Sequence, residues 1–392
     1  MSDAPSSWPL ERVEPESVGL CSRRLGRVGE LMRRYVDDGR IAGVITLAAR
    51  RGGIAHLECL GSMDLESRRP MREDAIFRIY SMTKIVTSAA VLMLLEEGRF
   101  LLGEPVRRFL PEFADLRVAV KVDDGREELV SPRRDVTIHD LLAHLGGLSY
   151  DCIHEARDGG RSLQEFITEF CKRPLLHQPG ETWAYSASTD VLGRVVEVVS
   201  GRPFDDFLRE RIFEPLGMTD TAFWVPPGKA DRLAWVYKPD ADGRLVSCED
   251  RAASPYLAKP SLPSGGGGLV STTSDYLRFA LMLLGEGSLC GVRLLGRKTV
   301  ELMTEDHLPA GHPALDVNRR GFGLGVSVVR RLGETEQLSS VGEFGWGGAA
   351  CTQVWIDPAE EMVSMLMLQL RPAEKFPLMD LFKHAVYQAI VD

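Results

Sequence analysis

Residues 79–98 read IYSMTKIVTSAAVLMLLEEG and place Ser81 and Lys84 three positions apart at the start of a long apolar run. The run predicts a helix that begins at Ser81 and ends near Gly98. Residues three apart lie on one helix face, about one turn from each other. The helix dipole favours a developing anion on Ser81, and Lys84 is placed to take the serine proton if its surroundings lower its pKa.

A second interpretation of the same pair is purely structural. Ser81 would then cap the helix, and Lys84 would face solvent. One serine and lysine at this spacing is close to the number expected by chance in a chain of 392 residues. Residues 85–95 argue against the structural interpretation, because their apolar character predicts a buried helix in which a surface lysine fits poorly.

The composition is that of an ordinary globular protein, with 44% hydrophobic and 26% charged residues. The length allows one large domain or two closely packed ones. A net charge of −9 argues against a nucleic-acid partner and offers no basic patch for a membrane surface.

Several features predict a cytoplasmic protein. Residues 1–20 have neither a basic start nor an apolar core, so no secretory signal is expected, and no apolar run approaches the length of a membrane span. The cysteines are odd in number and form no C-x-x-C pair, which predicts free thiols in a reducing compartment. They are Cys21, Cys59, Cys152, Cys171, Cys248, Cys290 and Cys351.

Strand patterns occur at both ends of the chain, and short helical patterns fill the middle. The predicted elements are a helix over 22–39, a β-hairpin over 41–49 and 54–61, strands over 321–333, 349–357 and 361–370 with a turn at 357–360, and a closing helix over 376–391.

This order of elements predicts an α/β (α+β) fold, with an antiparallel sheet flanked by helices and an inserted all-helical domain. The predicted sheet domain comprises residues 1–98 and 261–392. The predicted helical domain comprises residues 99–260, and the active site would lie between the two.

Two further stretches carry side chains or backbone suited to catalysis. Tyr185 follows a chain-breaking segment and precedes small residues, so its phenol is a candidate second proton carrier beside Ser81, although a buried core tyrosine is the commoner case. Residues 345–349 (GWGGA) lead into a strand, where an edge N–H is suited to complete an oxyanion hole with the N–H of Ser81. A glycine-rich turn is the alternative interpretation.

Other motifs are weaker. Residues 264–272 (SGGGGLVST) resemble a phosphate-binding loop but lack its G-K-[ST] ending, so they predict a loop into a helix capped by Ser274 or Asp275. His144 is expected to be a structural hydrogen-bonding residue. There is no G-x-S-x-G, no H-E-x-x-H and no cysteine and histidine pattern at zinc spacing, so no metal and no cofactor is expected.

Taken in order, Ser81-Met-Thr-Lys84, Tyr185-Ser-Ala and Trp346-Gly-Gly resemble the class C branch of the serine β-lactamase and penicillin-binding-protein superfamily. The resemblance extends over about residues 20–390 and implies the fold of that superfamily. Further similar stretches are FRIY (77–80), LLAHLGGL (141–148), EPLGM (214–218) and SGGGGLVST (264–272).

The departures from the β-lactamase pattern point to esters. Ala187 stands where β-lactamases of this class carry Asn, and Trp346-Gly347-Gly348 stands where they carry Lys-Thr-Gly. Polar groups that bind a β-lactam are thus missing, and an uncharged acyl ester fits better beside Trp346. These motifs are similar to those of the family VIII carboxylesterases, and also to fungal polyketide acyltransferases of the same fold.

The resemblance implies roles for individual residues. Ser81 would attack the ester, Lys84 and Tyr185 would share the proton transfers, and the N–H groups of Ser81 and Ala349 would hold the oxyanion. Substrate binding is expected from Trp346, Gly347, Gly348 and Tyr150.

The expected activity is therefore hydrolysis of short-chain carboxylic esters by a serine carboxylesterase. The alternatives are an acyltransferase, a β-lactamase or D-alanyl peptidase of weak activity, and an inert scaffold. The expected partner is a small ester, with β-lactams as weak substrates and without nucleic acid or membrane.

Overall fold

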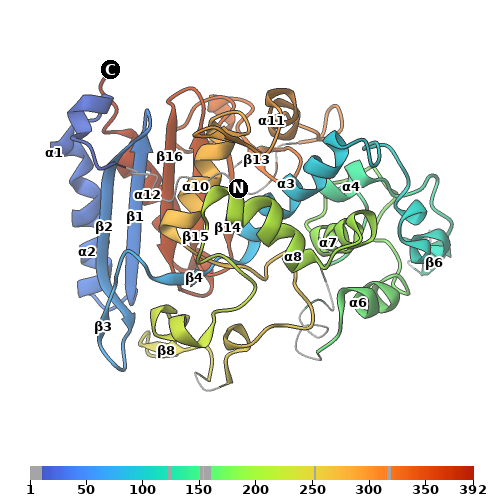
Figure 1. The fold of residues 1–392 in the computed structure, drawn as a ribbon, viewed down its shortest axis with the longest axis horizontal. Coiled ribbons are helices and arrows are strands. Elements are labelled where there is room, and N and C mark those ends of the chain that lie inside the picture. Colours follow the sequence, from blue (N-terminus) through green and yellow to red (C-terminus); the bar gives the residue numbers. More distant parts are fainter. Residues whose placement is uncertain are drawn as a thin grey trace, which may run out of the picture.

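The computed structural model describes residues 11–121, 126–150, 153, 160–250, 253–313, 315 and 319–392. At its centre is an eight-stranded antiparallel sheet in the order β12-β13-β14-β15-β16-β1-β2-β3 (Figure 1). Strands from the two ends of the chain meet where β1 pairs with β16. The strands of this sheet are β1 (Gly43–Arg50), β2 (Gly53–Asp64), β3 (Arg69–Pro70), β12 (Gly321–Phe322), β13 (Ser327–Val328), β14 (Phe344–Gly348), β15 (Thr352–Asp357) and β16 (Met362–Leu368).

Both predicted hairpins are present. The turn after β15 is closed by the Asp357 carboxylate, which accepts hydrogen bonds from the backbone N–H groups of Ala359 (3.1 Å) and Glu360 (3.2 Å). The single strand predicted over 321–333 is wrong, because the chain reverses between β12 and β13. Gly325 has a φ of +88° there, and a Cβ on it would lie 2.0 Å from Ser88 Oγ of helix α3 (Thr83–Glu96).

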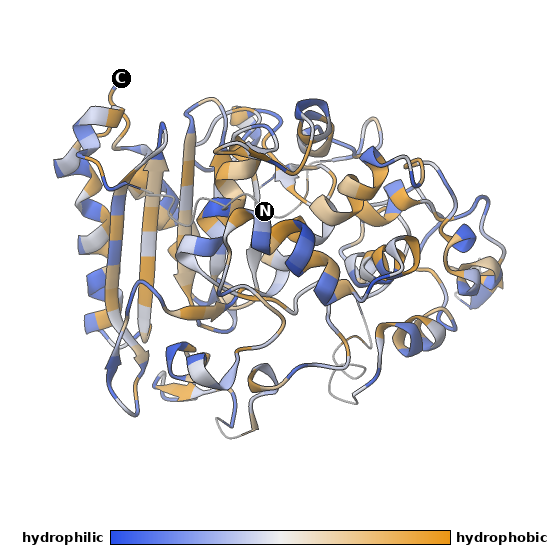
Figure 2. Cartoon of the chain, viewed as in Figure 1, coloured by the Kyte–Doolittle hydropathy of each residue, from blue (hydrophilic) through white to orange (hydrophobic). Residues whose placement is uncertain are grey.

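Helices cover both faces of the sheet, and the strands alternate between the two cores (Figure 1). On β1, Val44 belongs to the core under α2 and α12, whereas the next residue, Ile45, belongs to the core that includes α3 and α10. Figure 2 shows the resulting apolar strands between helices with polar outer faces. The helices are α1 (Ser22–Leu25), α2 (Arg27–Asp37) and α12 (Leu378–Tyr387) on one face, and α3 (Thr83–Glu96) and α10 (Thr273–Leu284) on the other.

The middle of the chain is mainly helical, and α7 packs against α3. Its helices are α4 (Ile138–Leu142), α6 (Leu163–Phe170), α7 (Ser188–Ser200), α8 (Phe204–Leu208) and α9 (Glu214–Leu216), and α11 (Arg297–Thr304) follows α10. The remaining strands form short pairs: β4 (Ile76–Arg78) with β9 (Val270–Thr272), β5 (Val118–Lys121) with β6 (Glu127–Val130), β7 (Tyr237–Pro239) with β8 (Leu245–Ser247), and β10 (Ser288–Leu289) with β11 (Val292–Arg293). The division into domains at 98/99 and 260/261 stays a prediction.

Two predicted helix starts are wrong. Helix α3 begins at Thr83, and Ser81 lies in a preceding 3₁₀ turn, η2 (Tyr80–Met82), where its side chain caps nothing. Helix α10 is capped by Thr272, whose hydroxyl accepts from the N–H of Asp275 (3.1 Å), and not by Ser274 or Asp275 itself. Within the described residues, no helix is long and apolar enough to cross a membrane.

Candidate active site

Ser81 is held where a strand, a 3₁₀ turn and a helix meet. Strand β4 pairs with β9, and the Ile79 N–H continues that pairing by donating to the Leu269 carbonyl at 3.1 Å. Tyr80 then adopts a φ of +43°, in the left-handed region that L-residues rarely occupy. This bend ends the strand and places Ser81 on the wall of a cavity.

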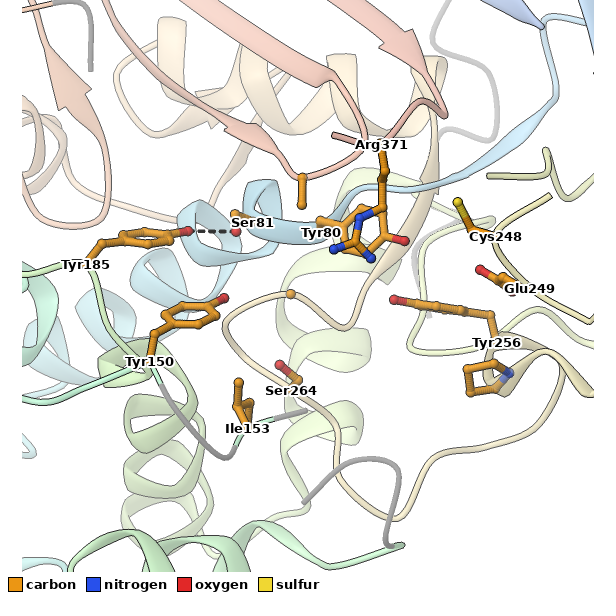
Figure 3. A pocket seen from close by; sticks show the side chains of 13 residues that line it. Tyr80, Ser81, Tyr150, Ile153, Tyr185, Cys248, Glu249, Tyr256, Ser264 and Arg371 are labelled. Carbon is orange, nitrogen blue, oxygen red and sulfur yellow. Dashed lines mark hydrogen bonds between the residues drawn. The ribbon is translucent and has the colours of Figure 1, made fainter. Parts of the chain in front are cut away.

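The three residues predicted to be catalytic are in direct contact. The Tyr185 hydroxyl donates to Ser81 Oγ at 2.7 Å, as the dashed line in Figure 3 shows. The Lys84 ammonium donates to the same oxygen at 3.2 Å and to the Gly266 carbonyl at 2.6 Å. Ser81 Oγ therefore lies between two groups that can carry its proton.

The surroundings of Lys84 favour its charged form. Burial lowers the pKa of Lys84, but the oxygens of Tyr185 and Tyr150 and the carboxylate of Asp190 raise it by more, so the pKa lies above its ordinary value. The ammonium lies 4.5 Å from the centre of the Tyr185 ring, so its charge is placed to attract negative charge that develops on this side chain during a reaction. The pKa of Lys84 is therefore raised, whereas a lysine that acts as a base would need a lowered pKa.

Two predicted substrate-binding aromatic residues flank Tyr185. The Tyr150 ring stacks on the Tyr185 ring with centres 5.3 Å apart, and its hydroxyl lies 3.5 Å from the Lys84 nitrogen. The Trp346 indole N–H donates to the Tyr185 hydroxyl at 3.2 Å. Trp346 thus fixes the phenol in place, and Tyr150 faces the cavity as well.

The glycines after Trp346 allow close backbone contacts. A Cβ on Gly348 would lie 2.5 Å from the Ile79 carbonyl oxygen, and one on Gly347 would lie 2.0 Å from the Gln353 amide oxygen. Strand β14 can therefore approach the segment before Ser81 only with glycine at position 348. Ala349 follows and lies on the cavity wall with Ser81, which keeps its backbone N–H a candidate for the oxyanion hole.

The cavity has a volume of about 440 Å³, and Figure 3 shows its lining side chains on both sides of Ser81. Trp346, Gly347 and Gly348 are not among its lining residues, so their predicted contact with substrate stays a prediction. The lining residues are Tyr80, Ser81, Tyr150, Ile153, Tyr185, Cys248, Glu249, Pro255, Tyr256, Ser264, Gly267, Ala349 and Arg371.

Comparisons with known proteins identify the family of the chain. The β-lactamase family model matches residues 28–388, which is most of the chain. The chain belongs to the β-lactamase family. The resemblance and the fold inferred from the sequence motifs are thereby confirmed.

Relatives within the β-lactamase family include hydrolases and acyltransferases. Esterase EstB of Burkholderia gladioli is 32% identical, over 68% of this chain and 72% of the relative. Monacolin J acid methylbutanoyltransferase of Aspergillus terreus is 29% identical, over 91% of this chain and 94% of the relative. The solved structure of EstCE1, described as a hydrolase with promiscuous acyltransferase activity, superposes with a TM-score of 0.78 at 25% identity, over 95% of this chain and 99% of that chain. The protein is thus a serine hydrolase or acyltransferase of the β-lactamase fold.

Sequence reasoning missed the support of Lys84 in this β-lactamase-family site. The buried Asp190 carboxylate accepts from Ser264 Oγ at 2.5 Å and from the Gly266 N–H at 3.1 Å, and the Gly266 carbonyl in turn accepts from Lys84. A Cβ on Gly266 would lie 2.4 Å from the Asp190 carboxylate. The glycine run at 265–268 was the signal in the sequence, but its role depends on helix α7, which carries Asp190.

His144 has the structural position expected for it. It is fully buried, and its Nδ1 lies 3.1 Å from Ser186 Oγ. Burial and the nearby Lys84 charge lower the pKa of His144 well below its ordinary value, so the ring is neutral. In the described part of the chain, histidine, cysteine and carboxylate side chains form no group suited to hold a metal ion.

Proposed function

We propose that the protein is a serine carboxylesterase that hydrolyses short-chain carboxylic esters through an acyl-enzyme on Ser81. The observation that carries this proposal is the position of Ser81 Oγ, 2.7 Å from the Tyr185 hydroxyl and 3.2 Å from the Lys84 ammonium, on the wall of a cavity. The esterase relatives support it, and the cavity of about 440 Å³ suits a small ester.

The cycle begins when Tyr185 releases its hydroxyl proton to solvent water, which leaves a phenolate beside the Lys84 ammonium. In the acylation step, Ser81 Oγ then forms a bond to the ester carbonyl carbon, and its proton passes to the Tyr185 oxygen along their short contact. Lys84 keeps its charge and stabilises that phenolate before the proton arrives. The N–H groups of Ser81 and Ala349 receive the carbonyl oxygen as it becomes negative. When the carbonyl re-forms, the alkoxy group leaves and takes the proton from Tyr185, which leaves an ester on Ser81.

In the second step, water attacks the Ser81 ester and gives its proton to Tyr185. The Ser81–carbon bond breaks, the proton returns to Ser81 Oγ, and the carboxylic acid departs. One residue, Tyr185, thus acts as base and then as acid in each half of the cycle.

Ser81→Ala tests this proposal with p-nitrophenyl butyrate as substrate. We expect the variant to lose at least about 10³-fold in kcat, since the covalent route is gone. Ser88→Ala is the control, because Ser88 lies in helix α3, which directly follows the turn of Ser81, and is buried with no hydrogen-bond partner for its hydroxyl among the described residues. Equal activity of Ser81→Ala and wild type would exclude the proposed function.

Acyl transfer is a second candidate, because one relative is named as a methylbutanoyltransferase and EstCE1 is described as having acyltransferase activity. Here an alcohol takes the place of water in the second step. The partition between ester exchange and hydrolysis, measured with an added alcohol, separates the two activities. Nitrocefin turnover by wild type and Ser81→Ala measures the weak β-lactam reaction that we also propose.

A further inference from the structure

The active-site cavity extends to two sides of Ser81, and the two sides differ in chemistry. Figure 3 shows Tyr185 and Tyr150 on one side, and Tyr256, Glu249 and Arg371 on the other. The proposed mechanism uses only the first side, since the leaving alkoxy group must reach the Tyr185 hydroxyl. The acyl part of the ester then extends toward the second side.

On this second side, the charge of Glu249 is already neutralised. Its carboxylate accepts from the fully buried Arg78 guanidinium at 2.7 Å, and the Ser254 hydroxyl donates to it at 2.7 Å. Arg78 also donates to the Ala234 carbonyl at 2.7 Å. The Arg78–Glu249 pair therefore adds no net charge to the cavity.

Arg371 has no such partner. Its side chain is exposed, and among the described residues its guanidinium makes no ion pair or side-chain hydrogen bond. The guanidinium carbon lies 5.8 Å from the centre of the Tyr80 ring, next to the nucleophile. An arginine carries its charge at every accessible pH, so this side of the cavity holds a positive charge that no ion pair within the described ranges neutralises.

The backbone of Arg371 is fixed relative to Ser81. Its N–H donates to the Tyr237 carbonyl at 2.9 Å, and the Leu370 N–H donates to the Ala350 carbonyl at 3.1 Å, beside the candidate oxyanion donor. The preceding Gln369 side chain hydrogen-bonds both the N–H and the carbonyl of Arg78, each at 3.1 Å. These hydrogen bonds tie the backbone at Arg371 to the segment before Ser81, through Arg78, and to the segment after Ala349, through Ala350.

We propose that Arg371 binds a carboxylate at the far end of the acyl chain, so that the preferred substrates are monoesters of dicarboxylic acids. The proposal rests on the proposed function and names its substrate class. A planar guanidinium pairs with a carboxylate through two parallel hydrogen bonds, which fixes the acyl chain as well as attracting it. The Tyr256 ring, which lines the same side, provides an apolar surface for the methylene groups.

The test compares three p-nitrophenyl esters of similar length: the adipate monoester (anionic), its methyl ester (neutral) and 6-aminohexanoate (cationic). We expect wild type to favour the anionic ester over the neutral one by about ten-fold in kcat/KM, and Arg371→Met to lose that preference. Arg371→Glu is expected to favour the cationic ester. Arg34→Met, which removes an exposed charge on α2 across the sheet, is expected to keep the wild-type ratio.

The two proposals fail in different ways. An unchanged anionic-to-neutral ratio in Arg371→Met, with hydrolysis of the neutral ester still dependent on Ser81, would overturn the role of Arg371 and leave the esterase intact. Hydrolysis that persists in Ser81→Ala would overturn the esterase itself.

Discussion

Two lysines of this protein are almost completely buried, and their partners differ in kind. Lys383 on α12 donates to the Glu343 carboxylate at 2.7 Å, and Arg320 donates to the same oxygen at 2.5 Å. Lys84 donates to the Gly266 carbonyl and to the hydroxyls of Ser81 and Tyr150. Lys383 lies beside charged side chains and also donates to the Ser339 hydroxyl at 3.2 Å, whereas the side-chain partners of Lys84 are hydroxyls alone.

The pKa values of the two lysines move in opposite directions. Burial and the neighbouring Arg320 lower the pKa of Lys383 to about 8. The pKa of Lys84 rises despite burial, because Tyr185, Tyr150 and Asp190 surround it. A buried lysine is therefore not by itself a mark of catalysis. Both ammonium groups reach a serine hydroxyl, but only the hydroxyl beside Lys84, that of Ser81, lies on the wall of the described active-site cavity.

The comparison of Lys84 with Lys383 predicts that replacing each lysine affects kcat very differently, and this is the largest effect expected. Lys84→Met is expected to lower kcat for ester hydrolysis by about 10²–10⁴-fold, because the phenolate of Tyr185 loses its stabilising charge. Lys383→Met is the matched control and is expected to keep wild-type kcat. Both are measured with p-nitrophenyl butyrate after circular dichroism shows that each is folded. Equal loss of kcat in the two variants would remove the distinction between the two sites.

Stability should show the opposite pattern. Glu343→Gln leaves Arg320 and Lys383 buried without their shared counter-charge and is expected to lower the free energy of unfolding by about 3 kcal/mol. Urea unfolding measures this loss. Asp190→Asn, which removes a buried carboxylate near Lys84, is the comparison, and we expect it to reduce kcat more than stability. If Glu343→Gln unfolds at the wild-type urea concentration, the Glu343 cluster does not stabilise the fold.

The half-buried titratable group His56 gives the smallest effect. His56 on β2 lies 2.8 Å from Thr46 Oγ1, and burial lowers the pKa of His56 to about 4. The unfolded chain then binds more protons between pH 4 and the ordinary histidine pKa of 6.5, so the free energy of unfolding rises with pH across that window. The side chain is half-buried, so the rise is about 1–2 kcal/mol.

His56→Gln should flatten the pH dependence between pH 4 and 6.5 and change little above it. Urea unfolding at pH 5 and pH 7.5 measures the difference. If the free energy of unfolding of His56→Gln still rises with pH as it does in wild type, another titratable group causes that rise.

Local pattern sufficed to predict part of this fold. The hairpin of β1 and β2, the turn at Asp357 and the order of strands and helices all follow from short-range periodicity and turn residues. The predicted strand over 321–333 failed because Gly325 turns the chain against α3, and nothing in its immediate neighbours reports that contact. The prediction of the residue that caps α10 was wrong because several polar residues lie in succession there, and only the backbone angles select Thr272.

The sequence by itself determined which reactive groups the protein has and in which order they occur: Ser81 and Lys84 on one turn, Tyr185 on a loop, and glycines after Trp346. The identity and order of these groups depend only on local spacing along the chain. Only the tertiary structure decided that Tyr185 reaches Ser81 across 104 residues, that Asp190 supports Lys84 through Gly266, and that Arg371 lines the cavity without an ion pair among the described residues. Contacts of this kind depend on how whole elements pack, and packing is not encoded in any one stretch of the chain.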